Sequence, residues 1–228
     1  MDLIIAARHG CLYDVKRLCD QGADVNFQDP YKRTALMYAP TLEIVKELCS
    51  RGADLEIQDE DGLTVLMLVT TRDSVKVDLI HYLCDQGAQL DTVNNFGRTA
   101  LIRAVLWGYK RNIQVLCDRG ANINIQDEEG STALMWAIRD RHTFAVEELC
   151  KRGADLELQT TSGHTALQIA ISEHYLTGVD ILCEYGVKVT YNDEHSTVFT
   201  KQQFRWGVMV CIDEVLTRDL LRHVHSWI

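Results

Sequence analysis

The stretch Leu116-Cys117-Asp118-Arg119-Gly120-Ala121-Asn122-Ile123-Asn124-Ile125-Gln126-Asp127 decides how this chain folds, because the chain repeats it at regular intervals. The glycines of its Leu-Cys-x-x-Gly-Ala core stand at Gly22, Gly52, Gly87, Gly120, Gly153 and Gly186, so the spacings are 30, 35, 33, 33 and 33 residues. A second phrase keeps the same period and begins at Thr34, Thr64, Thr99, Thr132 and Thr165. A period near 33 residues predicts a solenoid of stacked units.

One period, residues 127–159, predicts the structure of a unit. Asp127-Glu128-Glu129-Gly130 is a turn sequence, and Thr132 stands where its hydroxyl can cap a helix. Apolar residues three and four apart then follow in two short segments, and Gly153 is placed to end the second helix in a left-handed conformation. Because neither short helix can bury its apolar stripe alone, the units must stack.

The two phrases resemble the ankyrin repeat, in which a Thr-Pro-Leu-His-x-Ala phrase opens one helix and a Leu-Leu-x-x-Gly-Ala phrase closes the next. The resemblance covers roughly residues 1–192 and implies an all-α ankyrin-repeat solenoid. We expect residues 193–228 to form a divergent C-terminal capping repeat with a terminal helix, or alternatively a separate adaptor module. The expected repeats are 1–28, 29–58, 59–93, 94–126, 127–159 and 160–192.

Several positions depart from the family pattern. Repeat 29–58 is three residues short, which predicts a short first helix, and it carries Lys32 where the other turns carry glycine. Repeat 59–93 is two residues longer than the period, and the additional residues lie around 70–76. These changes in length are either neutral variation of the loops, or they form a notch that is shaped for a partner. The family histidine, which hydrogen-bonds neighbouring loops in ankyrin repeats, is also replaced, so we expect those bonds to be missing; the replacements are Met37, Met67, Ile102, Met135 and Gln168.

Composition and charge restrict the classes of partner and the compartment. The formal net charge is −10 and the sequence pI is about 5.2, which disfavours nucleic acid and anionic membranes as partners because both require a basic face. No apolar run reaches membrane-spanning length, and the N-terminus lacks the pattern of a signal peptide. We therefore expect an intracellular protein, in the cytoplasm, the nucleus or both.

The eight cysteines do not predict disulfides or a metal site. Six of them recur at the same place in successive repeats, and equivalent helices in a stack lie about 8–10 Å apart, whereas a disulfide requires Cα atoms within about 7 Å. No Cys-x-x-Cys pair occurs, so zinc is not expected. We expect small core thiols in a reducing compartment, and no cofactor.

The sequence does not predict an enzyme. It contains none of the Gly-x-Ser-x-Gly, Walker, dinucleotide-binding or His-Glu-x-x-His motifs, and its eight histidines are scattered. The acidic stretches Asp59-Glu60-Asp61 and Glu128-Glu129 are expected at solvated turn tips rather than in a closed cleft where acid–base work could be done.

The ankyrin resemblance implies a binding surface in a concave groove formed by the turn tips, or fingers, and the first helices. Trp, Tyr and Arg dominate binding hot spots, so we expect Trp107 and Trp136 to be apolar anchors and arginines to fix the register of an extended partner segment with some acidic character. Alternatively, Tyr38 and Trp136 pack between helices. The candidate residues are Tyr31, Arg33, Tyr38, Phe96, Arg98, Arg103, Leu106, Trp107, Trp136 and Arg139.

The function that follows is non-catalytic protein binding by a monomeric scaffold, adaptor or inhibitor. Two alternatives remain open: a substrate-recognition or regulatory subunit of an enzyme complex that docks through 193–228, and a structural repeat protein without a groove ligand. Ankyrin repeats with Asn in the Gly-Ala-Asp-Val-Asn phrase can also be hydroxylated. Asn26 and Asn124 match that position, and the other interpretation is that both are simple turn residues.

Overall fold

A computed structural model describes residues 2–71, 77–187, 189–190 and 196–197. Most of the long connection expected around 70–76 lies outside these residues. Of the expected C-terminal module 193–228, the structure describes only Ser196 and Thr197, so that prediction also lies outside the described part of the chain.

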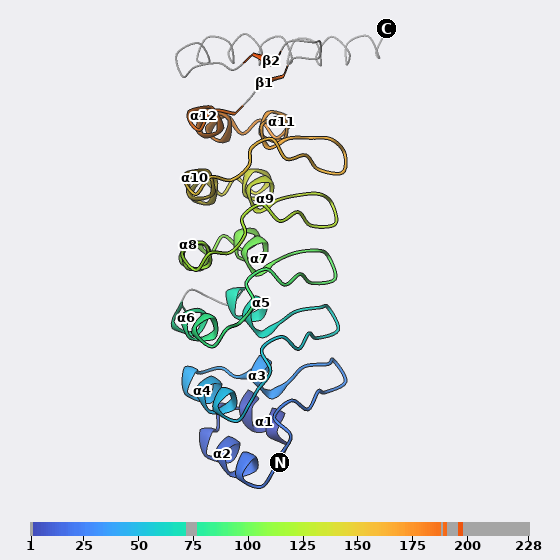
Figure 1. Ribbon diagram of the computed structural model, residues 1–228, viewed down its shortest axis with the longest axis vertical. Helices are drawn as coiled ribbons and strands as arrows, with labels where there is room; N and C mark the ends of the chain where they lie inside the picture. The colour runs from blue at the N-terminus through green and yellow to red at the C-terminus, as the bar shows by residue number, and fades with distance from the viewer. Residues whose placement is uncertain (1, 72–76, 188, 191–195, 198–228) are drawn as a thin grey trace.

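The described chain forms an elongated stack of helix pairs, with a loop projecting from the same side at each layer (Figure 1). In chain order the helices are α1 Leu3–Arg8, α2 Leu12–Asp20, α3 Ala35–Tyr38, α4 Leu42–Ser50, α5 Val65–Thr70, α6 Val77–Asp85, α7 Ala100–Leu106, α8 Lys110–Asp118, α9 Ala133–Arg139, α10 Thr143–Lys151, α11 Ala166–Ser172 and α12 Leu176–Glu184. Two-residue strands, β1 Val189–Thr190 and β2 Ser196–Thr197, pair antiparallel after the last helix. The all-α class predicted from the sequence is confirmed.

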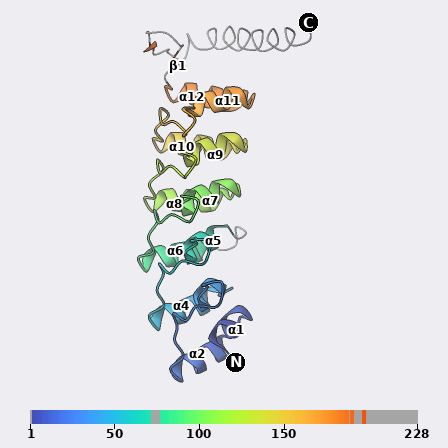
Figure 2. The same ribbon diagram turned by 90° about the vertical axis from the view of Figure 1, so that its right-hand side faces the viewer.

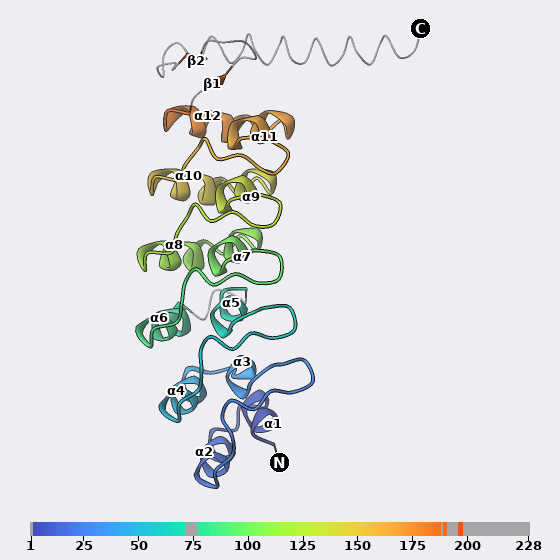
Figure 3. The same ribbon diagram turned by 45° about the vertical axis from the view of Figure 1, so that its right-hand side comes forward.

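The helices form two columns along the stack. The first helices of the pairs contact one another in the order α1, α3, α5, α7, α9 and α11, and the second helices do so from α2 to α12. Figure 2 shows the pairs lying one above another, and Figure 3 shows the two columns with the loops extending beyond the first helices. A continuous apolar core runs through all of these layers.

Local sequence signals explain where the helices begin and end. The threonine that opens each of α5, α7, α9 and α11 accepts a hydrogen bond from the third backbone N–H of its helix, which satisfies a group that has no partner within the helix. Gly153 follows the second helix of its repeat at φ 81°, as predicted. Helix α3 has only four residues and ends at Tyr38. The next residue, Ala39, has an extended backbone (ψ 121°), because a residue before a proline disfavours the helical region.

Neighbouring loops are bridged by glutamine side chains that stand at another register position than the family histidine. The amide of Gln126 donates to Gly130 O at 2.6 Å and to Gln159 O of the next repeat at 2.7 Å. The amide of Gln58 likewise donates to Gly62 O of its own turn at 2.8 Å and to Val93 O of the next loop at 2.9 Å. The repeated Gln therefore links its own turn to the loop of the next repeat.

Asn26 and Asn124 also link consecutive loops. Asn26 Oδ1 accepts from the backbone N–H of Asp54 at 2.8 Å, and Asn124 Oδ1 accepts from that of Asp155 at 2.9 Å. Both side chains therefore hold one repeat to the next.

The cysteines of the described residues are free thiols. Cys117 and Cys150 are buried in the second-helix column. Burial raises the pKa of the Cys117 thiol to about 11 and that of the Cys150 thiol to about 12. These thiols are therefore protonated core groups at neutral pH rather than nucleophiles.

Candidate functional site: the finger face

The finger face consists of the five turns 29–33, 59–63, 94–98, 127–131 and 160–164 and the helices α3, α5, α7, α9 and α11 that follow them. A polar side chain at the first position organises each turn. In the fourth turn, Asp127 Oδ1 accepts from the backbone N–H groups of Glu129 at 3.0 Å and Ser131 at 2.9 Å. The equivalent residues of the other turns make corresponding bonds; they are Asp29, Asp59, Asn94 and Thr160.

Consecutive fingers are joined by backbone hydrogen bonds. A backbone N–H near the tip of each finger donates to a carbonyl of the finger before it, at 2.9–3.1 Å. Because these bonds repeat at every layer, the side chains at the tips are presented on a surface that is already ordered. The donor and acceptor pairs are Glu60 to Tyr31, Asn95 to Asp61, Glu128 to Phe96 and Thr161 to Glu129.

Trp136, Arg98 and Arg139 meet in one cluster. The guanidinium carbons of Arg98 and Arg139 lie 4.6 and 4.8 Å from the centre of the Trp136 ring, a cation–π arrangement. The Trp136 Nε1–H donates to Asp127 Oδ2 at 2.8 Å, and Arg98 Nε donates to the same oxygen at 3.3 Å. Arg139 donates to Glu129 at 3.1 Å. The positive charges of the two arginines thus balance the negative charges of the two carboxylates within the cluster.

Tyr38 and Arg33 form a second cluster near the N-terminal end of the face. The Tyr38 hydroxyl donates to Asp29 Oδ2 at 2.8 Å, and Arg33 Nε donates to Asp59 Oδ2 at 2.9 Å. The guanidinium groups of Arg8 and Arg33 lie 5.2 and 6.0 Å from the Tyr38 ring centre. Tyr38 and Trp136 are both half-buried against the core, and the polar atom of each side chain is hydrogen-bonded to its finger.

The rings of Tyr31 and Phe96 are the exposed aromatic surface at the finger tips. They are 57% and 55% exposed. The Arg98 guanidinium lies 5.7 Å from the Phe96 ring centre, so Phe96 is continuous with the Trp136 cluster. These two rings are the apolar area that a partner could cover.

Trp107 and Leu106 lie at the opposite end of the first helix, at the connection between α7 and α8. Trp107 is 61% exposed, and its ring stacks on Tyr109 at 6.4 Å between centres. Leu106 is half-buried against the core. The structure therefore brings Trp136 together with Arg98 and Arg139, and it places Trp107 in a different aromatic pair.

Arg103 differs from the other arginines of the finger face. Its Nε is buried and has no hydrogen-bond partner within the described residues. Burial lowers the pKa of its guanidinium below the usual value, and the charge of Arg98 lowers it further, while Asp59 and Asp61 oppose the shift.

The carboxylates that fix these clusters were not among the residues predicted from the sequence. Asp59 was expected at a solvated tip, but its side chain is buried with 0% exposure because Arg33 and the turn N–H groups surround it. A spacing signal was present: an aromatic residue with a hydrogen-bond donor follows an aspartate by nine positions at Asp29 and Tyr38 and at Asp127 and Trp136.

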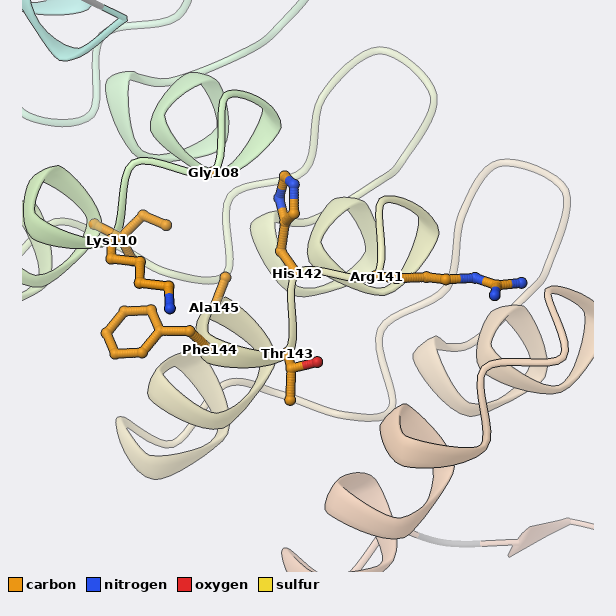
Figure 4. A pocket seen from close by; sticks show the side chains of 8 residues that line it. Gly108, Lys110, Arg141, His142, Thr143, Phe144 and Ala145 are labelled. Carbon is orange, nitrogen blue, oxygen red and sulfur yellow. The ribbon is translucent and has the colours of Figure 1, made fainter. Parts of the chain in front are cut away.

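A small pocket lies where the connection between α7 and α8 meets the start of α10, with a volume of about 290 Å³. Figure 4 shows Lys110 beside Phe144, whose ring centre is 5.3 Å from the ammonium group, while Arg141 extends away from both. Arg141 instead donates to the Glu173 carbonyl at 2.6 Å. The cationic groups do not converge, and the volume is at the lower limit of small-molecule sites.

Within the described residues, no group of His, Cys, Asp or Glu side chains could hold a metal ion. None of the helices in this part of the chain is long and apolar enough to cross a membrane.

Comparison with known families agrees with this architecture. Residues 40–127 and 113–193 match the family model described as ankyrin repeats (3 copies). The chain belongs to the ankyrin repeat family. Ankyrin repeats are in general protein–protein interaction modules. No match was found among curated proteins.

Many solved structures are similar to the chain, and the following three are examples. An ankyrin repeat domain from Acinetobacter baumannii is 27% identical, with a TM-score of 0.72 over 79% of this chain and 95% of that one. The ankyrin repeat protein EF0377 is 28% identical, with a TM-score of 0.74 over 80% and 96%. A chain from the complex of the predatory endopeptidase Bd0816 of Bdellovibrio bacteriovorus with the immunity protein Bd3460 is 32% identical, with a TM-score of 0.68 over 79% and 95%.

Proposed function

We propose that this protein is a non-catalytic interaction module, a scaffold, adaptor or inhibitor, that binds another protein through its finger face. The observation that carries the proposal is the pair of exposed rings, Tyr31 and Phe96, held on fingers that backbone hydrogen bonds lock together. Such a surface loses little conformational entropy on binding. Aromatic side chains and arginine are also among the residues that contribute most to the binding free energy at protein interfaces.

The proposed partner is a protein segment that lies along the fingers. Its apolar side chains cover Tyr31 and Phe96, and the cluster of Trp136, Arg98 and Arg139 borders the site. Because Arg98 and Arg139 are already paired with Asp127 and Glu129, they order the surface and do not supply free positive charge. We place the protein in a reducing compartment, inside the cell, in keeping with the unpaired thiols of its described residues.

Affinity capture from native cell extract tests the proposal with a matched pair of variants. Tyr31→Ala/Phe96→Ala removes the two finger rings. Tyr13→Ala/Leu176→Ala removes two apolar side chains of the second-helix column that are at least as exposed, at 75% and 59%. A partner bound by the wild type and the control, and lost by the finger variant, supports the proposal. A partner that both double variants retain contradicts it.

A further inference from the structure

Among the described arginines of the finger face, Arg103 has no carboxylate within ion-pair distance, whereas Arg33, Arg98 and Arg139 each have at least one. Of the two aspartates whose charge acts on Arg103, Asp61 is exposed and makes no ion pair with it, and Asp59 is already bonded to other groups. Asp59 accepts from Arg33 and from the N–H groups of its own turn, and Asp127 accepts from Arg98, Trp136 and its own turn.

The turn that precedes Arg103 has a neutral residue where a carboxylate would be expected. Tyr38 and Trp136, at the register of Arg103 in other repeats, each donate to an aspartate nine residues earlier. The residue nine positions before Arg103 is Asn94, and its side-chain oxygen accepts from the backbone of Phe96 and Arg98. The turn geometry is kept, but the negative charge is absent.

This arrangement leaves a partly dehydrated cation without an ion-pair partner, although the charges of Asp59 and Asp61 favour its protonated form. The Arg103 Nε is buried without an acceptor, and a buried donor without a partner is destabilising. An arginine remains charged at neutral pH in such a site. A carboxylate that arrives from outside could pair with the terminal amino groups of the guanidinium and supply the missing ion-pair partner.

We propose that Arg103 is the specificity-determining residue of the finger face and binds the side-chain carboxylate of an Asp or Glu in an extended partner segment. The same segment places an apolar side chain on Phe96, the exposed ring at the tip of the finger that precedes Arg103. This proposal deepens the proposed function and rests on it. It assigns the preference for acidic segments to Arg103 rather than to Arg98 and Arg139, which are neutralised within the chain.

Selection from a random-peptide library displayed on phage tests the proposal. Peptides fused at their C-terminus to a coat protein offer only side-chain carboxylates, so a preference for a free C-terminal carboxylate cannot contribute. Wild type should enrich peptides with Asp or Glu at one fixed position beside an apolar residue. The Arg103→Gln variant should show no preference for acidic peptides. The Arg103→Glu variant should instead enrich peptides with Lys or Arg at that position. Arg111→Gln, at an exposed site on α8 in the second-helix column, is the matched control and should keep the acidic preference.

A double-mutant cycle then measures the contact by fluorescence anisotropy on synthetic peptides. Arg103→Gln should weaken binding of the acidic peptide about tenfold or more and change binding of its Gln counterpart little, as for a charged hydrogen bond. Equal losses for both peptides, or an acidic preference that survives Arg103→Gln, would overturn the proposal while the finger face stands. If no enriched peptide depends on Tyr31 and Phe96, the extended-segment proposal fails, and the capture experiment shows separately whether the proposed function fails with it.

Discussion

Asp127 and Trp136 are joined by a hydrogen bond of 2.8 Å between the indole Nε1–H and the carboxylate Oδ2. Tyr38 and Asp29 make the equivalent bond at the same nine-residue spacing, also at 2.8 Å. In both repeats a half-buried aromatic side chain of a first helix is tied to the finger that precedes that helix. The direction in which the finger projects is thereby coupled to the packing of the helix against the core.

Trp136→Phe should destabilise the fold by about 2 kcal/mol, because the buried Asp127 carboxylate loses a donor. The measurement is the free energy of unfolding in urea. Trp107→Phe is the matched control, since that ring is exposed and stacks on Tyr109; it should cost less than about 0.5 kcal/mol. Equal effects of the two substitutions would show that the bond to Asp127 does not order the repeat.

Arg103→Leu should stabilise the fold by about 1 kcal/mol, because it removes a buried donor that has no partner. Leu68 and Ile169 already occupy the same register in neighbouring repeats, so an aliphatic side chain suits the site. Arg98→Leu makes the same change at a paired position and should instead destabilise by about 2 kcal/mol, because Asp127 loses a cation. A loss of stability in Arg103→Leu, measured by the same urea titration, would contradict the account of Arg103 as an unpaired charge.

The repeat architecture could be predicted from the sequence because its signals are local. Thr132 and Gly153 mark the ends of helices through hydrogen bonds and backbone angles within a few residues. The short helix α3 likewise follows from the deletion and from Pro40. Each of these features depends on neighbours in the chain rather than on the partner repeat.

The electrostatics of the finger face could not be predicted in the same way, because they depend on contacts between repeats. Arg98 and Asp127 are 29 residues apart, and their pairing depends on the distance between layers and on the side-chain rotamers. The sequence nevertheless contained a signal: Arg33 and Arg98 are each followed one repeat later by an aspartate, whereas Leu63 is followed by Asn94. Comparing equivalent positions of adjacent repeats would have predicted these ion pairs.

Gly130→Ala should destabilise the fold more than Gly153→Ala, although both glycines have a left-handed backbone, at φ 72° and 81°. A Cβ at residue 130 would lie 2.6 Å from the backbone N of Thr161, which donates to the preceding finger, whereas a Cβ at residue 153 meets nothing within 4 Å. The strain of a left-handed alanine costs about 1 kcal/mol at either site. The clash should add at least about 1 kcal/mol at residue 130, and urea unfolding of the two variants measures the difference. If the two losses are equal, the contact between fingers adds no stability.

Stability should fall as the pH rises above about 9, because the thiols of Cys117 and Cys150 have raised pKa values of about 11 and about 12 in the folded chain. The unfolded chain, with thiol pKa values near 9.0, loses these protons first, so alkaline pH favours unfolding. Each thiol contributes a slope of about 1.4 kcal/mol per pH unit between its unfolded and folded pKa values.

Cys117→Ala/Cys150→Ala should therefore flatten the decline of the unfolding free energy between about pH 9 and pH 11, measured by urea titration under reducing conditions. Val146→Ala truncates a fully buried, non-titrating side chain on the same helix as Cys150. It should lower stability by a similar amount at every pH and leave the slope unchanged, because it removes no proton-binding group. A double cysteine variant that retains the wild-type slope would show that these two thiols do not link folding to alkaline pH, and the decline would then have to come from other titrating side chains.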